Sequence, residues 1–239
     1  MIRSQRYGTF YCFSPGVMLA TFIIEISYII YIVLRYKANR LTKIGLGILV
    51  SLAIFQLAEY IICIRPSLGG AVWAKVGFVA ITALLPLGVQ FVYALVGRGW
   101  NWLIATAYGS STLWMLFFVF YPGILQNYGC GGNYAIFTIK PGFGSAFLLF
   151  YYFWLYVGTL LALKLVLTQK KETPAVRRSL ALFIVAYLAL LIPTTTVNAL
   201  KPETFVGIPS IMCGFALIMA TIITFLIIPR TSILKKGKQ

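Results

Sequence analysis

Long apolar stretches alternate along the chain with short polar connections. Seven of these stretches are long enough for a spanning helix, which needs about 20 mostly apolar residues. They cover residues 15–34, 44–63, 70–95, 101–121, 145–168, 179–199 and 205–228. The first is too long for the apolar core of a signal peptide and has no clear small-residue cleavage site, so we expect it to be retained. The pattern predicts an all-α, polytopic membrane protein built as a seven-transmembrane-helix bundle.

One connection, residues 122–144, is longer than the others and is rich in glycine, proline and aromatic residues. This composition predicts a loop or hairpin that caps the outer face of the bundle. The other connections are too short to hold a catalytic domain. We therefore expect an extracytoplasmic N-terminal segment at residues 1–14, a seven-helix transmembrane domain at residues 15–229 and a basic cytoplasmic tail at residues 230–239.

The composition supports a membrane location. Hydrophobic residues make up 61% of the chain and charged residues 10%, against about 45–50% and about 25% in soluble domains. Mean hydropathy is +0.93. These values exclude a water-soluble globule. We therefore expect the chain to be embedded in a lipid bilayer. The 20 basic residues outnumber 4 acidic ones, but they cluster in the short connections, as membrane topology requires. We expect no nucleic-acid partner.

The basic residues also predict an orientation, because seven spans place the termini on opposite sides of the membrane. The tail and the connections after the first, third and fifth spans carry 13 of the 20 basic residues, and the opposite side carries 5. By the positive-inside rule, the more basic side is cytoplasmic. We expect the N-terminus outside and the C-terminus in the cytoplasm.

Several catalytic classes are excluded by the residues that are absent. The chain contains no His and no Asp, and its acidic residues are Glu25, Glu59, Glu172 and Glu203. A Ser-His-Asp hydrolase and a His/Asp metal site therefore lack their side chains, and no phosphate-binding P-loop motif occurs. We expect a protein that is not an enzyme and that holds no cofactor and no metal.

Ionisable side chains within a span often mark function or a buried pair, and three are central candidates here: Glu25, Glu59 and Lys75. Glu59 and Lys75 lie at similar depth in adjacent antiparallel spans, so we expect an ion pair, which is either a static link between helices or part of a ligand site. Glu25 has no basic residue at its depth. It is either protonated and hydrogen-bonded, with Ser27 and Tyr28 as nearby partners, or it lines a wet cavity and relays protons.

Prolines and aromatic residues suggest where a cavity lies. Pro193 and Pro209 fall in the outer halves of the last two spans, and Pro86 falls in the middle of the third. Kinks at matched depth favour an outer-half cavity. Tyr152 and Tyr156 share one face of the fifth span at i, i+4 spacing. This pair belongs to an interfacial belt, to the core, or to a platform for a ligand.

Three of the four cysteines can reach the outer side, which is an oxidising setting in an exported loop. They are Cys12, Cys63 and Cys130. A Cys12–Cys130 or a Cys63–Cys130 disulfide would pin the long connection, and free thiols remain an alternative. Cys213 lies within the last span and is expected to be inert core.

Residues 46–99 resemble the N-terminal seven-transmembrane sensor region of bacterial and archaeal histidine kinases. The features that match are Glu59, Trp73, Lys75, Pro86, Tyr93, Gly97 and Arg98, with the later PGFGS and IPS segments. The resemblance covers most of residues 15–234 and implies seven helices, an outside N-terminus, signal input from the outer face or the membrane, and location in a prokaryotic plasma membrane. Because the chain contains no His and ends about ten residues after the last span, we expect no kinase domain.

The leading functional hypothesis is a membrane sensor or receptor-like domain without its own catalytic output. It would pass an outer-face or membrane signal to a separate cytoplasmic signalling protein, and self-association into a homodimer is also open. Its ligand site would contain Glu59, Lys75 and Trp73 with the aromatic pair Tyr152 and Tyr156. The alternative is a small-solute transporter or permease, although no internal repeat is evident between the two halves.

Overall fold

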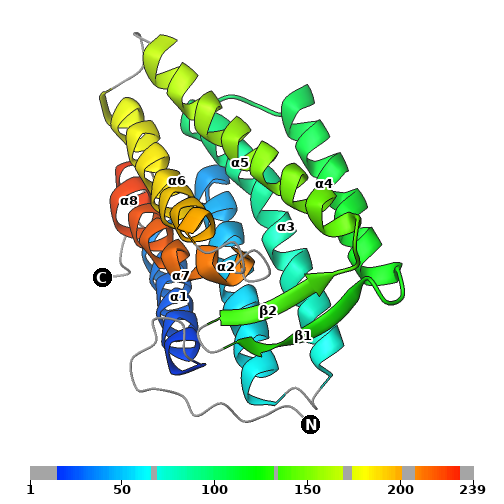
Figure 1. Ribbon diagram of the computed structural model, residues 1–239. Coiled ribbons are helices and arrows are strands. Elements are labelled where there is room, and N and C mark those ends of the chain that lie inside the picture. The colour runs from blue at the N-terminus through cyan, green and yellow to red at the C-terminus, as the bar shows by residue number, and fades with distance from the viewer. Residues whose placement is uncertain (1–14, 66–68, 132–133, 169–173, 201–207, 232–239) are drawn as a thin grey trace.

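The computed structural model describes residues 15–65, 69–131, 134–168, 174–200 and 208–231. In these ranges, seven helices are long and apolar enough to cross a membrane, which confirms the predicted helical bundle. The first six are α1 Pro15–Arg35, α2 Arg40–Ile64, α3 Gly70–Leu95, α4 Trp102–Phe120, α5 Phe143–Thr168 and α6 Pro174–Leu200, and the seventh span, Gly214–Thr231, begins within α7 Ile208–Thr221. The chain continues from α7 through a π-helical segment, Ile222–Ile227, into α8, Ile228–Thr231 (Figure 1).

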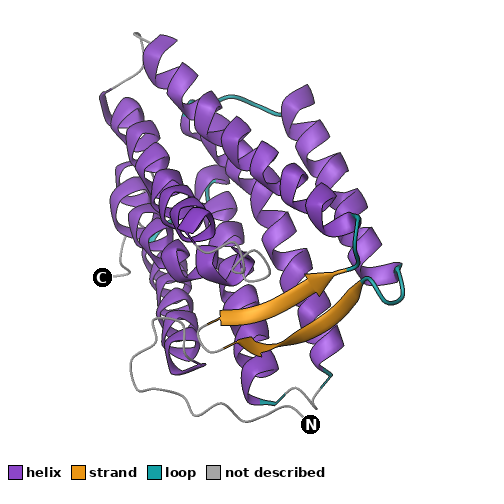
Figure 2. Ribbon diagram, in the orientation of Figure 1, coloured by secondary structure: helices purple, strands orange, loops and turns teal. Residues whose placement is uncertain are grey.

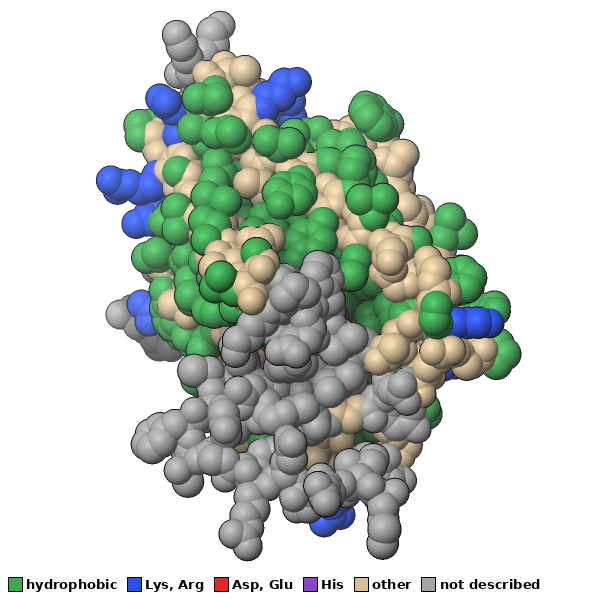
Figure 3. Space-filling view, viewed as in Figure 1, with side chains coloured by type: hydrophobic (Ala, Val, Ile, Leu, Met, Phe, Trp, Pro, Cys, Tyr) green, Lys and Arg blue, Asp and Glu red, His purple; other side chains and the backbone are tan. Residues whose placement is uncertain are grey.

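Helices α2 and α3 form the centre of the bundle. They contact each other along their lengths, α1 packs on α2, and α4 packs on α3. About three quarters of the most apolar stretch of α3 is buried, compared with about a fifth in α1 and in α4. Apolar side chains are spread over the whole described face in Figure 3, where most visible Lys and Arg side chains lie toward the upper end. Such an apolar surface suits contact with lipid rather than water.

Short connections with local caps hold neighbouring helices antiparallel. The Asn39 side chain accepts a hydrogen bond from the Thr42 amide at 2.7 Å and caps the start of α2. The Asn101 side chain accepts one from the Ile104 amide at 3.0 Å and caps α4. Each cap satisfies an amide that has no partner within its own helix. Gly97, at φ 67°, lets the chain turn sharply between α3 and α4.

The structure also contains two short strands, which the all-α fold class did not include. β1 (Leu125–Gly131) pairs with β2 (Tyr134–Ile139) in an antiparallel hairpin, with an irregularity between Leu125 and Asn127. The hairpin packs against α2, α3, α5 and α7, and Figure 2 shows it lying across the end of the bundle where α2 ends and α3 begins. The prediction that residues 122–144 form a loop or hairpin cap is therefore confirmed as a hairpin.

The last span is not a uniform α-helix. Its π-helical segment brings Phe225 against two tyrosines of α1, with ring centroids 5.1 Å from Tyr28 and 5.4 Å from Tyr31. A π-helical turn is rare and often occurs at a functional position. Pro209 lies in the first turn of α7, where proline fits without a kink, whereas Pro86 and Pro193 lie inside α3 and α6.

Candidate functional site

The predicted Glu59–Lys75 ion pair is wrong. Lys75 Nζ instead donates a hydrogen bond to the Val119 backbone oxygen of α4, at 2.9 Å. Glu59 is 1% exposed inside the bundle, while Lys75 and its neighbour Trp73 are half-buried at the start of α3. Similar depth fixes only the position along a helix axis, and the Lys75 side chain reaches α4 rather than α2.

Glu25 of α1 is fully buried, with 0% of its surface exposed. Neither carboxyl oxygen has a hydrogen-bond partner among the described residues. Ser27 donates to the Ile23 carbonyl oxygen, and Tyr28 bonds to Thr221 at 3.2 Å, so neither nearby hydroxyl reaches the carboxyl. The prediction that they satisfy Glu25 is wrong.

Glu59 is the second buried acid, and its carboxyl group lies close enough to that of Glu25 for the two to interact electrostatically. Two ionised carboxylates in such a place would repel each other and would lose their hydration. The arrangement therefore suits a Glu25 carboxyl that carries its proton. Both glutamates of the described residues therefore lie in this part of the bundle.

The aromatic pair of α5, Tyr152 and Tyr156, lies toward the lateral surface of the bundle. Tyr152 and Tyr156 stack with ring centroids 6.3 Å apart, which confirms that they share a face. Tyr156 is 48% exposed, so this face suits contact with lipid. The neighbouring Tyr151 and Leu155 are buried instead and point toward the centre of the bundle.

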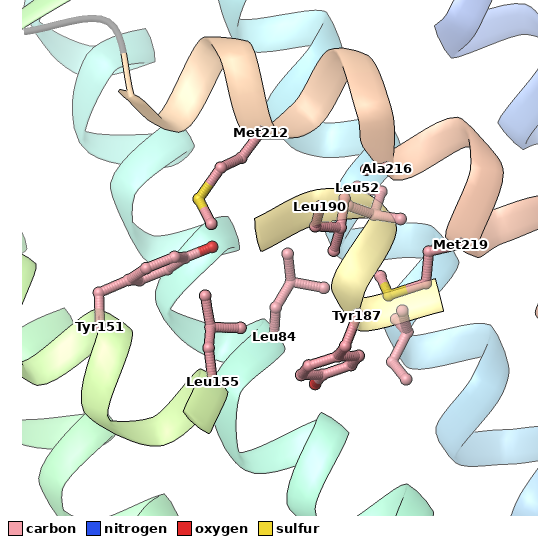
Figure 4. A pocket seen from close by; sticks show the side chains of 10 residues that line it. Leu52, Leu84, Tyr151, Leu155, Tyr187, Leu190, Met212, Ala216 and Met219 are labelled. Carbon is pink, nitrogen blue, oxygen red and sulfur yellow. The ribbon is translucent and has the colours of Figure 1, made fainter. Parts of the chain in front are cut away.

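A central cavity lies where those two side chains meet α2, α3, α6 and α7. Its volume is about 30 Å³, room for one or two water molecules. Figure 4 shows Tyr151 and Leu155 facing Leu84 of α3, with Tyr187 of α6 and Met212 of α7 nearby. Leu84 lies about 21 Å along α3 from its start at 1.5 Å per residue. The cavity is thus nearer the middle of the bundle than the outer half that we expected.

Tyr187 is held tightly beside this cavity. A methyl group added at Gly88 of α3 would overlap the Tyr187 hydroxyl oxygen, and one added at Gly158 of α5 would lie 3.5 Å from its ring. The Phe183 ring centroid lies 4.4 Å from that of Tyr187. Two glycines on neighbouring helices therefore make the space into which a buried tyrosine of a third helix fits, as small residues do at helix contacts in membranes.

Cys63, near the end of α2 beneath the hairpin, is disulfide-bonded. Cys12 lies outside the described residues, and the side chains of Cys130 and Cys213 are not described. In the backbone, Cys130 pairs with Ala135 across the hairpin. The free-thiol alternative is therefore wrong for Cys63, and the Cys12–Cys130 pairing stays a prediction.

A second cavity, of about 400 Å³, opens at the end of the bundle opposite the hairpin. The connection before α2, the end of α3, the start of α6 and the end of α8 form it. We call it the basic pocket, because Arg40, Arg98 and Arg230 line it. Its other lining residues are apolar or uncharged, and none of those described is acidic.

Sequence reasoning missed both the central cavity and the basic pocket. The residues of the basic pocket are far apart in the chain, and each counted only as one more basic residue of a connection. Hydrophobic pattern gave no reason to choose Tyr151 over Tyr152. In the described chain, no three His, Cys, Asp or Glu side chains gather where they could hold a metal ion.

No protein-family model matches the chain, and no curated protein sequence matches it. The resemblance to the sensor region of histidine kinases therefore stays a prediction.

Proposed function

We propose that this protein is a multi-pass membrane sensor or receptor-like protein that passes a signal from the outer face, or from the membrane, to a separate cytoplasmic protein. The observation that carries the proposal is the pair of helices α2 and α3. Both contact the hairpin at one end, and both contribute to the basic pocket at the other. A rigid-body shift of these helices would link the two ends of the molecule.

Signalling by such a shift needs a ligand that binds two conformations with different affinity. The hairpin is a surface that an outer ligand can contact, and it packs on α2, α3, α5 and α7 together. The π-helical segment of the last span, Ile222–Ile227, supports a functional role for that span, because π-helical turns are rare and occur frequently at functional sites.

The orientation in this proposal has the N-terminus outside and the basic end in the cytoplasm of a prokaryotic cell. Two features support it. The basic residues favour that end by the positive-inside rule. The disulfide of Cys63 lies at the opposite end of α2 from Arg40, and disulfides persist in oxidising compartments.

Site-specific photo-crosslinking in cells tests the proposal. A crosslinker at exposed Lys37 or Arg178, on the basic end, should capture the same cytoplasmic protein, whose activity changes when the sensor is stimulated. The matched positions Val72 and Lys140, exposed near the hairpin end, should not capture it. Capture at neither end, or capture of the same protein at both, would contradict the proposal.

The transporter alternative keeps one observation in its favour, the buried Glu25 carboxyl without a described partner. A carboxyl of this kind is typical of proton-coupled transport. Solute flux into proteoliposomes that is lost in Glu25→Gln, with no change in protein yield or fold, would favour transport over sensing.

A further inference from the structure

We propose that the basic pocket binds a phosphate-bearing anion, supplied by an anionic lipid headgroup or by a soluble phosphate. This inference does not depend on the sensor function. The pocket volume of about 400 Å³ falls in the range of about 300–1,000 Å³ that is usual for ligand sites. Arginine guanidinium groups match the geometry of phosphate oxygens and bind them through paired hydrogen bonds.

Two of the three arginine side chains of the basic pocket donate hydrogen bonds to backbone carbonyl oxygens. Arg40 Nη1 donates to the Arg98 carbonyl oxygen at 2.9 Å, and Arg230 Nη1 donates to the Leu226 carbonyl oxygen at 2.8 Å. A guanidinium group has five N–H donors, so each of these bonds leaves others for a ligand. The first bond joins the start of α2 to the connection that follows α3, and the second holds the Arg230 guanidinium against its own span.

The electrostatic balance of the pocket favours an anion. Helices α2 and α6 begin there, and α3 and α8 end there, so the partial charges at the helix ends oppose one another. The arginine charges are therefore the main electrostatic feature of the described lining. Arg40 and Arg230 place two like charges at one cavity, and a bound anion would stabilise both.

The position of the pocket relative to the membrane favours a lipid as the source. Trp100 and Trp102 follow Arg98 by two and four residues and are 60% and 76% exposed. Exposed tryptophans gather at the level of the lipid headgroups. The basic pocket thus lies at the depth where headgroup phosphates are found, and basic pockets between membrane helices are known to hold such groups.

Ligand binding to the full-length purified protein, delipidated in a neutral detergent, tests the inference. Native mass spectrometry measures binding of dioleoylphosphatidylglycerol, with dioleoylphosphatidylcholine as the zwitterionic comparison. Equilibrium dialysis measures binding of radiolabelled inorganic phosphate. The test variant is Arg40→Gln with Arg230→Gln. The control is Lys43→Gln with Arg178→Gln, which removes the same charge from exposed positions at the same end, outside the pocket.

Wild type and control should bind phosphatidylglycerol alike, and the test variant should bind it about tenfold more weakly or worse, because it loses two charge-assisted donors. Loss of phosphatidylglycerol binding alone identifies a lipid site, and loss of phosphate binding in the test variant identifies a soluble ligand. Equal binding by wild type and test variant would overturn the inference. So would equal weakening in the control, or wild type binding neither probe. Thermal stability and gel filtration check that both variants fold.

Discussion

Replacing Gly88 by alanine should weaken the packing of three helices at one point. The added methyl group would overlap the Tyr187 hydroxyl oxygen and lie 3.1 Å from Tyr187 Cζ. The tyrosine cannot turn away easily, because the Phe183 ring packs against it at a tilt with ring centroids 4.4 Å apart, and Gly158 of α5 approaches the tyrosine ring as well. The result is an overpacked contact between α3 and α6.

Two opposing effects set the magnitude. Overpacking a well-filled core costs about 1–3 kcal/mol, while alanine is favoured over glycine within a helix by about 1 kcal/mol. The net loss expected for Gly88→Ala is therefore about 0–2 kcal/mol, which places it about 1–3 kcal/mol below a glycine-to-alanine change that meets no neighbour. The control is Gly109→Ala in α4, where an added methyl group meets nothing within 4 Å. That change should leave stability equal or slightly higher.

A double-mutant cycle makes the test specific to one contact. Tyr187→Phe removes the hydroxyl group that the methyl would overlap, so Gly88→Ala should cost much less in that background. Stability is measured by heating the detergent-solubilised protein and following the folded peak by fluorescence-detected gel filtration. If Gly88→Ala is as stable as Gly109→Ala, or if Tyr187→Phe gives no relief, the packing argument is refuted.

Three other changes test the polar and covalent contacts. Glu25→Gln should change stability by less than about 1 kcal/mol, because the amide has the shape of a protonated carboxyl; a loss of several kcal/mol would mean that the carboxylate is ionised and paired. Lys75→Met should cost about 0.5–1.5 kcal/mol for the lost hydrogen bond to Val119, and a cost of about 3–5 kcal/mol would instead indicate a buried ion pair. Cys63→Ser should cost about 2–4 kcal/mol under non-reducing conditions, and reductant should lower the melting temperature of wild type toward that of the variant; no effect of either would contradict the disulfide.

The sequence was sufficient to predict the helices, because length and apolar content decide whether a segment can cross a bilayer. The observed ends of α2 through α6 fall within about five residues of the predicted ones. The hairpin could also be predicted, since the segment at 122–144 combines turn-forming glycine and proline with aromatic residues. These features depend on local composition, and local composition is what a single sequence reports well.

The sequence could not predict which face of each helix is buried, for a physical reason. In water, a helix marks its buried side by its apolar residues, but in a membrane the lipid side is as apolar as the core. Tyr151 and Tyr152 are adjacent in sequence and equal in type, yet Tyr151 is buried beside the central cavity and Tyr152 is half-buried on another face of α5. The same lack of directional information made the Glu59–Lys75 ion pair look reasonable, because depth was the only coordinate that the sequence supplied.

The distribution of polar groups also bears on the choice between sensing and transport. A transported solute needs a hydrated route, which must open at each end in turn. In the described chain, the centre of the bundle holds a cavity of about 30 Å³ lined mainly by leucine, isoleucine, methionine and alanine, while the larger, cationic cavity opens at one end only. To pass a solute, α2, α3, α6 and α7 would have to separate around Tyr187, which packs against Gly88 and Gly158. A receptor needs only a small shift of the same helices, and such a shift is compatible with close packing in the middle and a cationic pocket at one end.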